Sequence, residues 1–123
     1  MSVALVVEDD AALRIIYNRI LTQLGFDVIA VDTAIDGIEQ LHAVAPDILF
    51  LDMRLPGSLD GNDVLNFILD HPDLHYLPIV VVSTNHHSFN GATSSLNLSF
   101  VQKPILPKDI KNLAQQVLPS RAC

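Results

Sequence analysis

The sequence is poor in cysteine and in basic residues, and each shortage excludes a class of protein. Cys123 has no second cysteine to pair with, which excludes an internal disulfide and leaves no basis for a metal–thiolate site. Seven lysines and arginines stand against fourteen acidic residues, so the net charge is −7. Duplex binding draws much of its affinity from basic residues that neutralise phosphates. We therefore expect no direct contact with nucleic acid.

The sequence also lacks a long apolar run, although its mean hydropathy is +0.37. The longest apolar stretches, such as residues 3–7 and 79–82, have the length of strands. A membrane span needs about 20 apolar residues, and a secretory signal needs a basic start before a longer apolar region. With 123 residues, the chain is expected to be one soluble, cytoplasmic domain.

Apolar patterning alternates between strand-like and helix-like segments. Short apolar runs predict five strands, at residues 3–7, 28–31, 48–51, 79–82 and 100–102. Helical periodicity appears at 11–24, 35–41, 62–69 and 108–118. This alternation is typical of βαβ units with right-handed crossovers. The predicted fold is α/β, with a doubly wound, five-stranded parallel sheet and helices on both of its faces.

Several residues are expected to set the ends of these helices. Gly25 should stop the first helix, Asp32 or Thr33 should cap the second, and Asn62 should cap the third. A fourth helix is expected by alternation within residues 84–99. That segment is rich in serine and threonine and contains Asn90-Gly91, so we predict a short or irregular helix there.

Polar side chains follow the ends of four predicted strands. They are Glu8, Asp9 and Asp10 after the first, Asp52 after the third, Ser83 and Thr84 after the fourth, and Lys103 after the fifth. Open α/β sheets bind ligands at the carboxyl ends of their strands. Carboxylates suit Mg²⁺, a carboxylate nucleophile forms an acyl phosphate, and an ammonium neutralises phosphoryl oxygens. The pattern predicts metal-assisted phosphoryl transfer.

Simpler interpretations exist for each residue taken alone. Asp9 or Asp10 could serve only as a helix cap, and Asp52 could be a loop acid. The joint pattern favours a site. His86-His87 could bind a transition metal, although a solvated loop pair is the preferred interpretation. The histidines His42, His71 and His75 have no shared ligand spacing and are predicted to lie on the surface.

Four motifs give the sequence a family resemblance. They are Val6-Val7-Glu8-Asp9-Asp10 with Leu13-Arg14, Ile48 to Pro56 with Asp60-Gly61, Leu77 to Ser83, and Phe100-Val101-Gln102-Lys103-Pro104. Over residues 3–118 the chain resembles the receiver domains of two-component response regulators, including chemotaxis regulators. The resemblance implies a flavodoxin-like strand order of 2-1-3-4-5.

The resemblance also implies a role for each site residue. Asp52 is implied as the phosphoacceptor, and Lys103 as the residue that contacts the phosphate. Asp9 is implied as the direct Mg²⁺ ligand, Glu8 as a ligand acting largely through water, and the Arg54 backbone carbonyl as a further ligand. Ser83 is implied as the switch hydroxyl and Phe100 as the switch aromatic. The Lys103-Pro104 peptide is often cis in this family. Here the loop after Asp52 is one residue longer than usual, Thr84 replaces a very small residue, and the segment from Ser83 to Lys103 is about two residues short.

The implied function is a phosphorelay receiver that switches shape to control a partner protein. A histidine kinase or a histidine phosphotransfer protein would donate the phosphoryl group. Residues 1–119 would form the receiver domain and residues 120–123 a tail. The protein would be a monomer or a weak dimer, and the domain would either stand alone or be part of a longer chain. It would be no enzyme beyond catalysing its own phosphorylation and dephosphorylation. Two alternatives remain: a pseudo-receiver that never turns phosphate over, and an aspartyl phosphatase, which Arg54 disfavours because such enzymes usually have a second Asp at that position.

Overall fold

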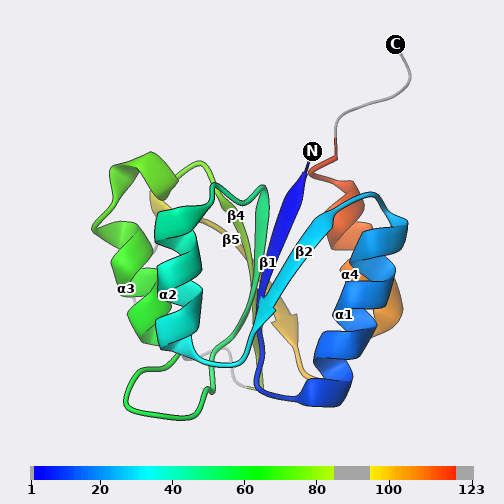
Figure 1. Cartoon of the computed structure of the whole chain (residues 1–123), viewed down its shortest axis with the longest axis horizontal. Helices are drawn as coiled ribbons and strands as arrows, with labels where there is room; N and C mark the ends of the chain where they lie inside the picture. Colours follow the sequence, from blue (N-terminus) through cyan, green and yellow to red (C-terminus); the bar gives the residue numbers. More distant parts are fainter. Residues whose placement is uncertain (1, 85–94, 119–123) are drawn as a thin grey trace.

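The computed structural model describes residues 2–84 and 95–118 of the chain. Its strands are β1 (Val3–Val7), β2 (Asp27–Val31), β3 (Ile48–Asp52), β4 (Pro78–Ser83) and β5 (Asn97–Gln102). Its helices are α1 (Ala11–Gln23), α2 (Ala34–Ala43), α3 (Gly61–Leu69), α4 (Pro107–Gln115) and a 3₁₀ turn, η1 (Pro72–Leu74). Figure 1 shows the helices in two groups, α1 with α4 and α2 with α3, on opposite sides of the strands. The predicted α/β architecture is confirmed.

All strand pairs are parallel, and the sheet order is β2-β1-β3-β4-β5. This is the predicted flavodoxin-like order. The central strand β3 is buried at every position, and β1 and β4 are buried at all positions but the first. Strands covered on both faces by helices read as continuous apolar runs, which is why the sequence located these three closely.

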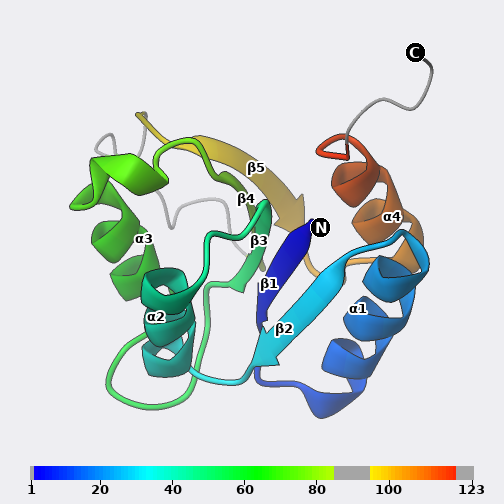
Figure 2. The same ribbon diagram turned by 45° about the horizontal axis from the view of Figure 1, so that its top comes forward.

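The fifth strand differs from the prediction. β5 begins at Asn97, three residues before the predicted start at Phe100. It lies at the edge of the sheet beside β4 (Figure 2), and its exposed residues include Asn97 and Ser99. The predicted irregular segment therefore ends before Asn97. The fourth helix expected by alternation falls mainly on residues 85–94, as do His86 and His87, and lies outside the described residues.

Side-chain caps define where three helices begin. Asp10 accepts from the backbone N–H groups of Ala12 and Leu13, and Thr33 accepts from Asp36, as one of its two predicted caps. The α3 cap is Asp60, which accepts from the Asn62 N–H, so the prediction of Asn62 as the cap was wrong. Because Asp63 also binds the Asp60 N–H at 2.8 Å, the two acids form a capping box, and α3 starts at Gly61.

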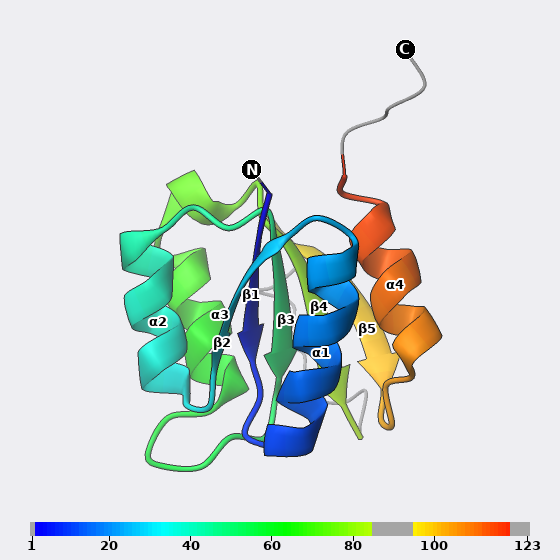
Figure 3. The ribbon, with the colours of Figure 1, turned by 45° about the vertical axis from the view of Figure 1, so that its right-hand side comes forward.

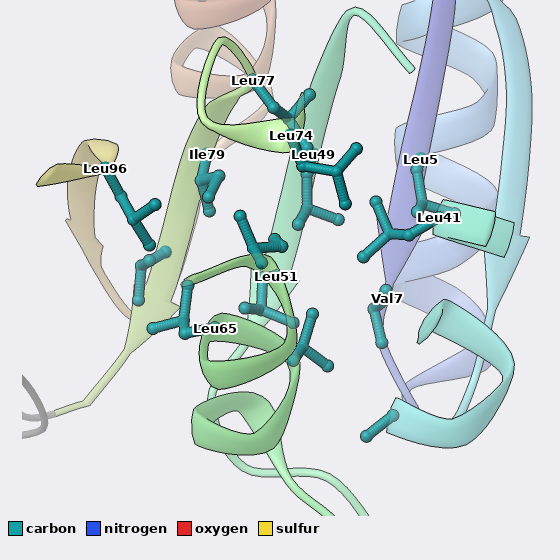
Figure 4. Close-up of a cluster of buried hydrophobic side chains, with 14 of the residues drawn as sticks. Leu5, Val7, Leu41, Leu49, Leu51, Leu65, Leu74, Leu77, Ile79 and Leu96 are labelled. Carbon is teal, nitrogen blue, oxygen red and sulfur yellow. The ribbon is translucent and has the colours of Figure 1, made fainter. Parts of the chain in front are cut away.

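The sheet separates two apolar clusters. One lies under α2 and α3 and includes Leu5, Leu49, Leu51 and Leu65 (Figure 4). The other lies under α1 and α4, which run side by side over the sheet in Figure 3. In this second cluster the rings of Tyr17 and Phe50 lie 5.1 Å apart. Within the described residues no helix is long and apolar enough to cross a membrane.

Three rings join α2 to α3. The rings of His42 and Phe67 lie 4.8 Å apart, and the His71 ring stacks on Phe67 at 4.0 Å. His75 Nε2 lies 3.1 Å from the carbonyl oxygens of Ile68 and Leu69 at the end of α3. His42 is exposed as predicted, whereas His71 and His75 are half-buried. Their roles depend on contacts between elements, which residue spacing does not reveal.

Gly37 marks the closest approach of α2 to the sheet. Alanine normally stabilises a helix interior relative to glycine by about 1 kcal/mol, yet a Cβ atom here would lie 2.8 Å from Cγ2 of the fully buried Val7. We predict that Gly37→Ala lowers the free energy of unfolding by about 1–3 kcal/mol in urea titrations. In the double variant Gly37→Ala/Val7→Ala, the loss of unfolding free energy should be smaller than the sum of the losses in the two single variants. A Gly37→Ala protein more stable than wild type would contradict this packing.

Candidate phosphoryl-transfer site

The carboxyl ends of the strands bring the predicted polar residues to one edge of the sheet. Asp52 and Ser83 are the last residues of β3 and β4, while Glu8 and Lys103 directly follow β1 and β5. In Figure 3 the strand arrows point to this edge, where α1 begins and the chain leaves β3 for α3. Parallel pairing therefore assembles groups that are up to 95 positions apart in the sequence.

Asp52 is the buried carboxylate at the centre of this edge. The residue is 2% exposed, and its two oxygens have different partners. Oδ1 accepts from the backbone N–H of Arg54 at 3.0 Å, and Oδ2 accepts from the Lys103 ammonium at 3.1 Å. The backbone N–H of Lys103 in turn donates to the Ser83 carbonyl at 2.9 Å, which ties β5 to β4 beside the carboxylate. The Lys103–Pro104 peptide is cis, as the family resemblance implied.

Glu8, Asp9 and Asp10 form a tight turn between β1 and α1, which we call the acid turn. Glu8 is buried, and its Oε2 accepts from the backbone N–H of Asp10 at 3.1 Å. The Arg14 guanidinium donates to the Glu8 carbonyl at 2.9 Å from one turn into α1. Asp10 is used as the helix cap, which leaves the exposed carboxylate of Asp9 available at the site. Of the two acids that could have been caps, only Asp10 is one.

The acid turn and Asp52 together make a set of oxygen donors that fits a hard divalent cation. One carboxylate oxygen from each of Glu8, Asp9 and Asp52 lies within 4.8 Å of the others. Glu8 Oε1 is buried and has no hydrogen-bond partner among the described residues. A buried polar atom without a partner is costly, and an oxygen-ligated ion such as Mg²⁺ would satisfy it.

The same crowding changes the titration of Glu8. Burial, followed by the nearby Asp52 carboxylate, raises the pKa of Glu8 to about 8, although the Asp10 N–H and the Lys103 charge act in the opposite direction. Removing a carboxyl group from water disfavours its charged form, and a second negative charge adds to that effect. Glu8 therefore holds its proton at neutral pH in the metal-free protein.

Two hollows open at this edge and share Thr84 and Lys103. One, of about 340 Å³, lies over Asp52 and is lined by Ser83 and by residues of the β3–α3 connection and the start of α3. The other, of about 720 Å³, lies beside the acid turn and the first residues of α1. Asp52 is thus reached through a polar pocket large enough for a phosphoryl group.

Most of the predicted site residues meet here, and two further contacts were not foreseen. Ser83 lies in the pocket, and Phe100 on β5 packs against the core cluster under α2 and α3. Arg54 contacts Asp52 through its backbone N–H. Sequence reasoning missed the Arg14 contact with the acid turn and the place of Asn62 on the pocket wall. Arg14 belongs to the first of the four family motifs, but only the structure shows what its side chain contacts.

Comparison with known proteins gives a consistent result. Residues 4–115 match the family model described as the response regulator receiver domain. The chain is 38% identical over 102 residues to the luminescence regulatory protein LuxO of Vibrio campbellii, covering 80% of this chain and 21% of that protein. It is 27% identical over 121 residues to protein PilG of Pseudomonas aeruginosa, covering 94% of this chain and 87% of PilG. The chain thus spans about a fifth of the length of its LuxO relatives.

Solved structures share the fold. The chemotaxis response regulator CheY4 of Vibrio cholerae superposes with a TM-score of 0.82 at 18% identity, covering 96% of this chain and 99% of that one. A second match is the receiver domain of sensor histidine kinase PA1611 from P. aeruginosa, which was solved with magnesium coordinated in its active-site cleft. It superposes with a TM-score of 0.78 at 23% identity, covering 94% of this chain and 95% of that one.

The raised pKa of Glu8 gives a testable pH dependence. Between about pH 4.5 and 8 the folded protein keeps a proton that the unfolded chain has lost, so Glu8 makes stability fall as pH rises through this window. We predict that Glu8→Gln, measured in urea with EDTA present, gains stability over wild type by up to about 1.4 kcal/mol per pH unit. The gain should vanish near pH 4.

Glu39→Gln is the matched control, because Glu39 is an exposed glutamate on α2. It measures the effect of the same chemical change away from the acid turn. A constant stability difference between Glu8→Gln and wild type from pH 5 to 8 would contradict the assignment.

Proposed function

The chain belongs to the response-regulator receiver family, and on that premise we propose that it accepts a phosphoryl group on Asp52 and thereby controls a partner protein. The observation that carries this proposal is the environment of Asp52. Its carboxylate is buried, bound to Lys103 at 3.1 Å, and open to a polar pocket beside two further acids. A loop acid or a simple helix cap would need none of these features.

We propose that an oxygen of Asp52 attacks the phosphorus of a phosphorylated histidine on the donor. The new bond joins that oxygen to phosphorus, the phosphorus–nitrogen bond breaks, and the leaving imidazole takes the electron pair. Lys103 neutralises a phosphoryl oxygen, and Ser83 at the pocket wall donates a hydrogen bond to another. Since such transfers depend mainly on positioning and charge, the backbone contact that holds Asp52 is part of the mechanism.

A magnesium ion fits this proposal through the oxygen donors already described. Asp9 and Asp52 would ligate it directly, and Glu8 would act largely through water. The Arg54 backbone carbonyl would be the remaining ligand from the protein. When bound, the ion offsets negative charge on the phosphoryl oxygens. The unpartnered Oε1 of Glu8 and the raised pKa of its carboxyl both support a cation at this position.

The output would be a change of shape around Ser83 and Phe100. A phosphoryl group adds nearly two negative charges, toward which Ser83 and Lys103 can move. Converting a 1:99 equilibrium to 99:1 needs about 5.5 kcal/mol, and one charge-assisted hydrogen bond supplies about 1.5–3 kcal/mol. Ser83 alone is therefore too weak, and the switch requires Ser83, Lys103 and the metal together. Phe100 would respond by packing alone.

We further propose that a histidine kinase or a histidine phosphotransfer protein supplies the phosphoryl group. Residues 1–119 would act as the receiver domain, as a monomer or weak dimer, and its chemistry would be limited to its own phosphorylation and dephosphorylation. A phosphatase with an aspartyl nucleophile is disfavoured, because the second residue after Asp52 is Arg54. A pseudo-receiver is disfavoured by the complete set of Glu8, Asp9 and Lys103 around Asp52.

The first test is phosphorylation by acetyl phosphate with Mg²⁺, followed by intact mass spectrometry. We predict one added phosphate on wild type and none on Asp52→Asn, because the amide is not a nucleophile of comparable strength. Omitting Mg²⁺ should reduce labelling of wild type strongly. Stoichiometric labelling of Asp52→Asn would show that another residue is the acceptor and would falsify the assignment.

The second test separates the metal ligand from its neighbour. Asp9→Asn and Asp10→Asn remove the same charge from adjacent residues, and asparagine still caps a helix well at position 10. We predict that Asp9→Asn weakens Mg²⁺ binding at least tenfold in calorimetric titration, while Asp10→Asn changes it less than threefold, since only Asp9 lies in the donor cluster. Equal losses in both variants would point to charge alone rather than ligation.

A further inference from the structure

We propose that Asn62 is a further catalytic residue, whose side-chain amide orients the water that hydrolyses the phosphorylated Asp52. This inference rests on the proposed function, because it concerns the decay of the same phosphoryl group. Asn62 is the second residue of α3, and it lines the pocket over Asp52 together with Thr84 and Lys103. None of the roles assigned above to the acids, Ser83 or Lys103 includes holding this water.

The position of Asn62 is fixed by Gly61. A Cβ atom on Gly61 would lie 2.6 Å from Cα of Met53 and 2.9 Å from the carbonyl oxygen of Asp52. The Gly61 N–H donates to the Met53 carbonyl at 3.1 Å. Gly61 therefore rests directly on the backbone of the phosphoacceptor, and the Cα of Asn62 is only about 3.8 Å further along the chain.

The helix start that carries Asn62 is also held in place. The capping box of Asp60 and Asp63 binds two backbone N–H groups, one of them the N–H of Asn62 itself, at 2.9 Å. The side-chain amide of Asn62 is exposed and makes no hydrogen bond with the described residues. A backbone held by these hydrogen bonds thus places at the pocket wall an amide that can both donate and accept hydrogen bonds.

Hydrolysis needs a water placed in line with the bond that breaks. The water oxygen bonds to phosphorus, the bond from phosphorus to the Asp52 oxygen breaks, and the electron pair returns to the carboxylate. Both hydrogens of the water stay on the phosphate, which leaves as H₂PO₄⁻. An amide can accept a hydrogen bond from this water and donate one to a phosphoryl oxygen, as amides that orient attacking water do in other phosphoryl transfers.

The test compares two asparagines of α3. Asn62→Ala removes the proposed amide, and Asn66→Ala is the matched control, because Asn66 is exposed on the same helix but does not line the pocket. Each protein is phosphorylated with acetyl phosphate and Mg²⁺, the donor is removed with Mg²⁺ retained, and the loss of phosphate is followed by intact mass. We expect Asn62→Ala to decay about tenfold more slowly than wild type, the effect of one lost hydrogen bond.

The forward reaction distinguishes catalysis from structure. Transfer from acetyl phosphate uses no water, so Asn62→Ala should slow decay by a larger factor than it slows phosphorylation, whereas Asn66→Ala should match wild type in both directions. Decay of Asn62→Ala at the wild-type rate, or equal slowing by both variants, would overturn the role of Asn62 alone. A wild-type protein that takes no phosphate would overturn the proposed function and this inference with it.

Discussion

The ion pair between Lys103 and Asp52 is the interaction on which the rest of the site depends. Glu8 and Asp52 are both buried at one end of the sheet, where burial and then the charge of Asp52 raise the pKa of Glu8. Lys103 forms the one ion pair found among the described residues, with its side chain 30% exposed and that of Asp52 1% exposed. A single ammonium therefore offsets the charge of Asp52, while burial and the nearby Asp52 charge raise the pKa of Glu8.

The sequence predicted β1, β3 and β4 better than it predicted β5, for a physical reason. β1, β3 and β4 are covered on both faces, so each reads as an unbroken apolar run that hardly depends on its neighbours. β5 lies at one edge, where Asn97 and Ser99 are exposed. Polar residues at such positions look like a loop in the sequence, and only pairing with β4 shows that they belong to a strand.

The site was predictable to the extent that it follows from strand ends. Glu8, Asp52 and Ser83 were found because parallel strands deliver their carboxyl ends to one edge. The contacts that fix them were not, because they depend on distances between segments. The Arg14 guanidinium reaches back to the acid turn, and Gly61 packs on the Asp52 backbone with no room for a side chain. The cap of α3 shifted from Asn62 to Asp60 because the two acids of the capping box bind each other's backbone.

These contacts also indicate which face of the protein would change its structure on phosphorylation. A phosphoryl group on Asp52 would move the negative charge outward, and Lys103 would follow it away from the carboxylate. Lys103 is tied to β4 through the Ser83 carbonyl, and Phe100, three residues before it, packs in the cluster under α2 and α3. On the other side of Asp52, Gly61 packs the start of α3 against the backbone of Asp52 and Met53. Both sets of contacts lie on the same face of the sheet. A rearrangement around phosphorylated Asp52 would therefore affect α3 and β5 more directly than α1 or α4.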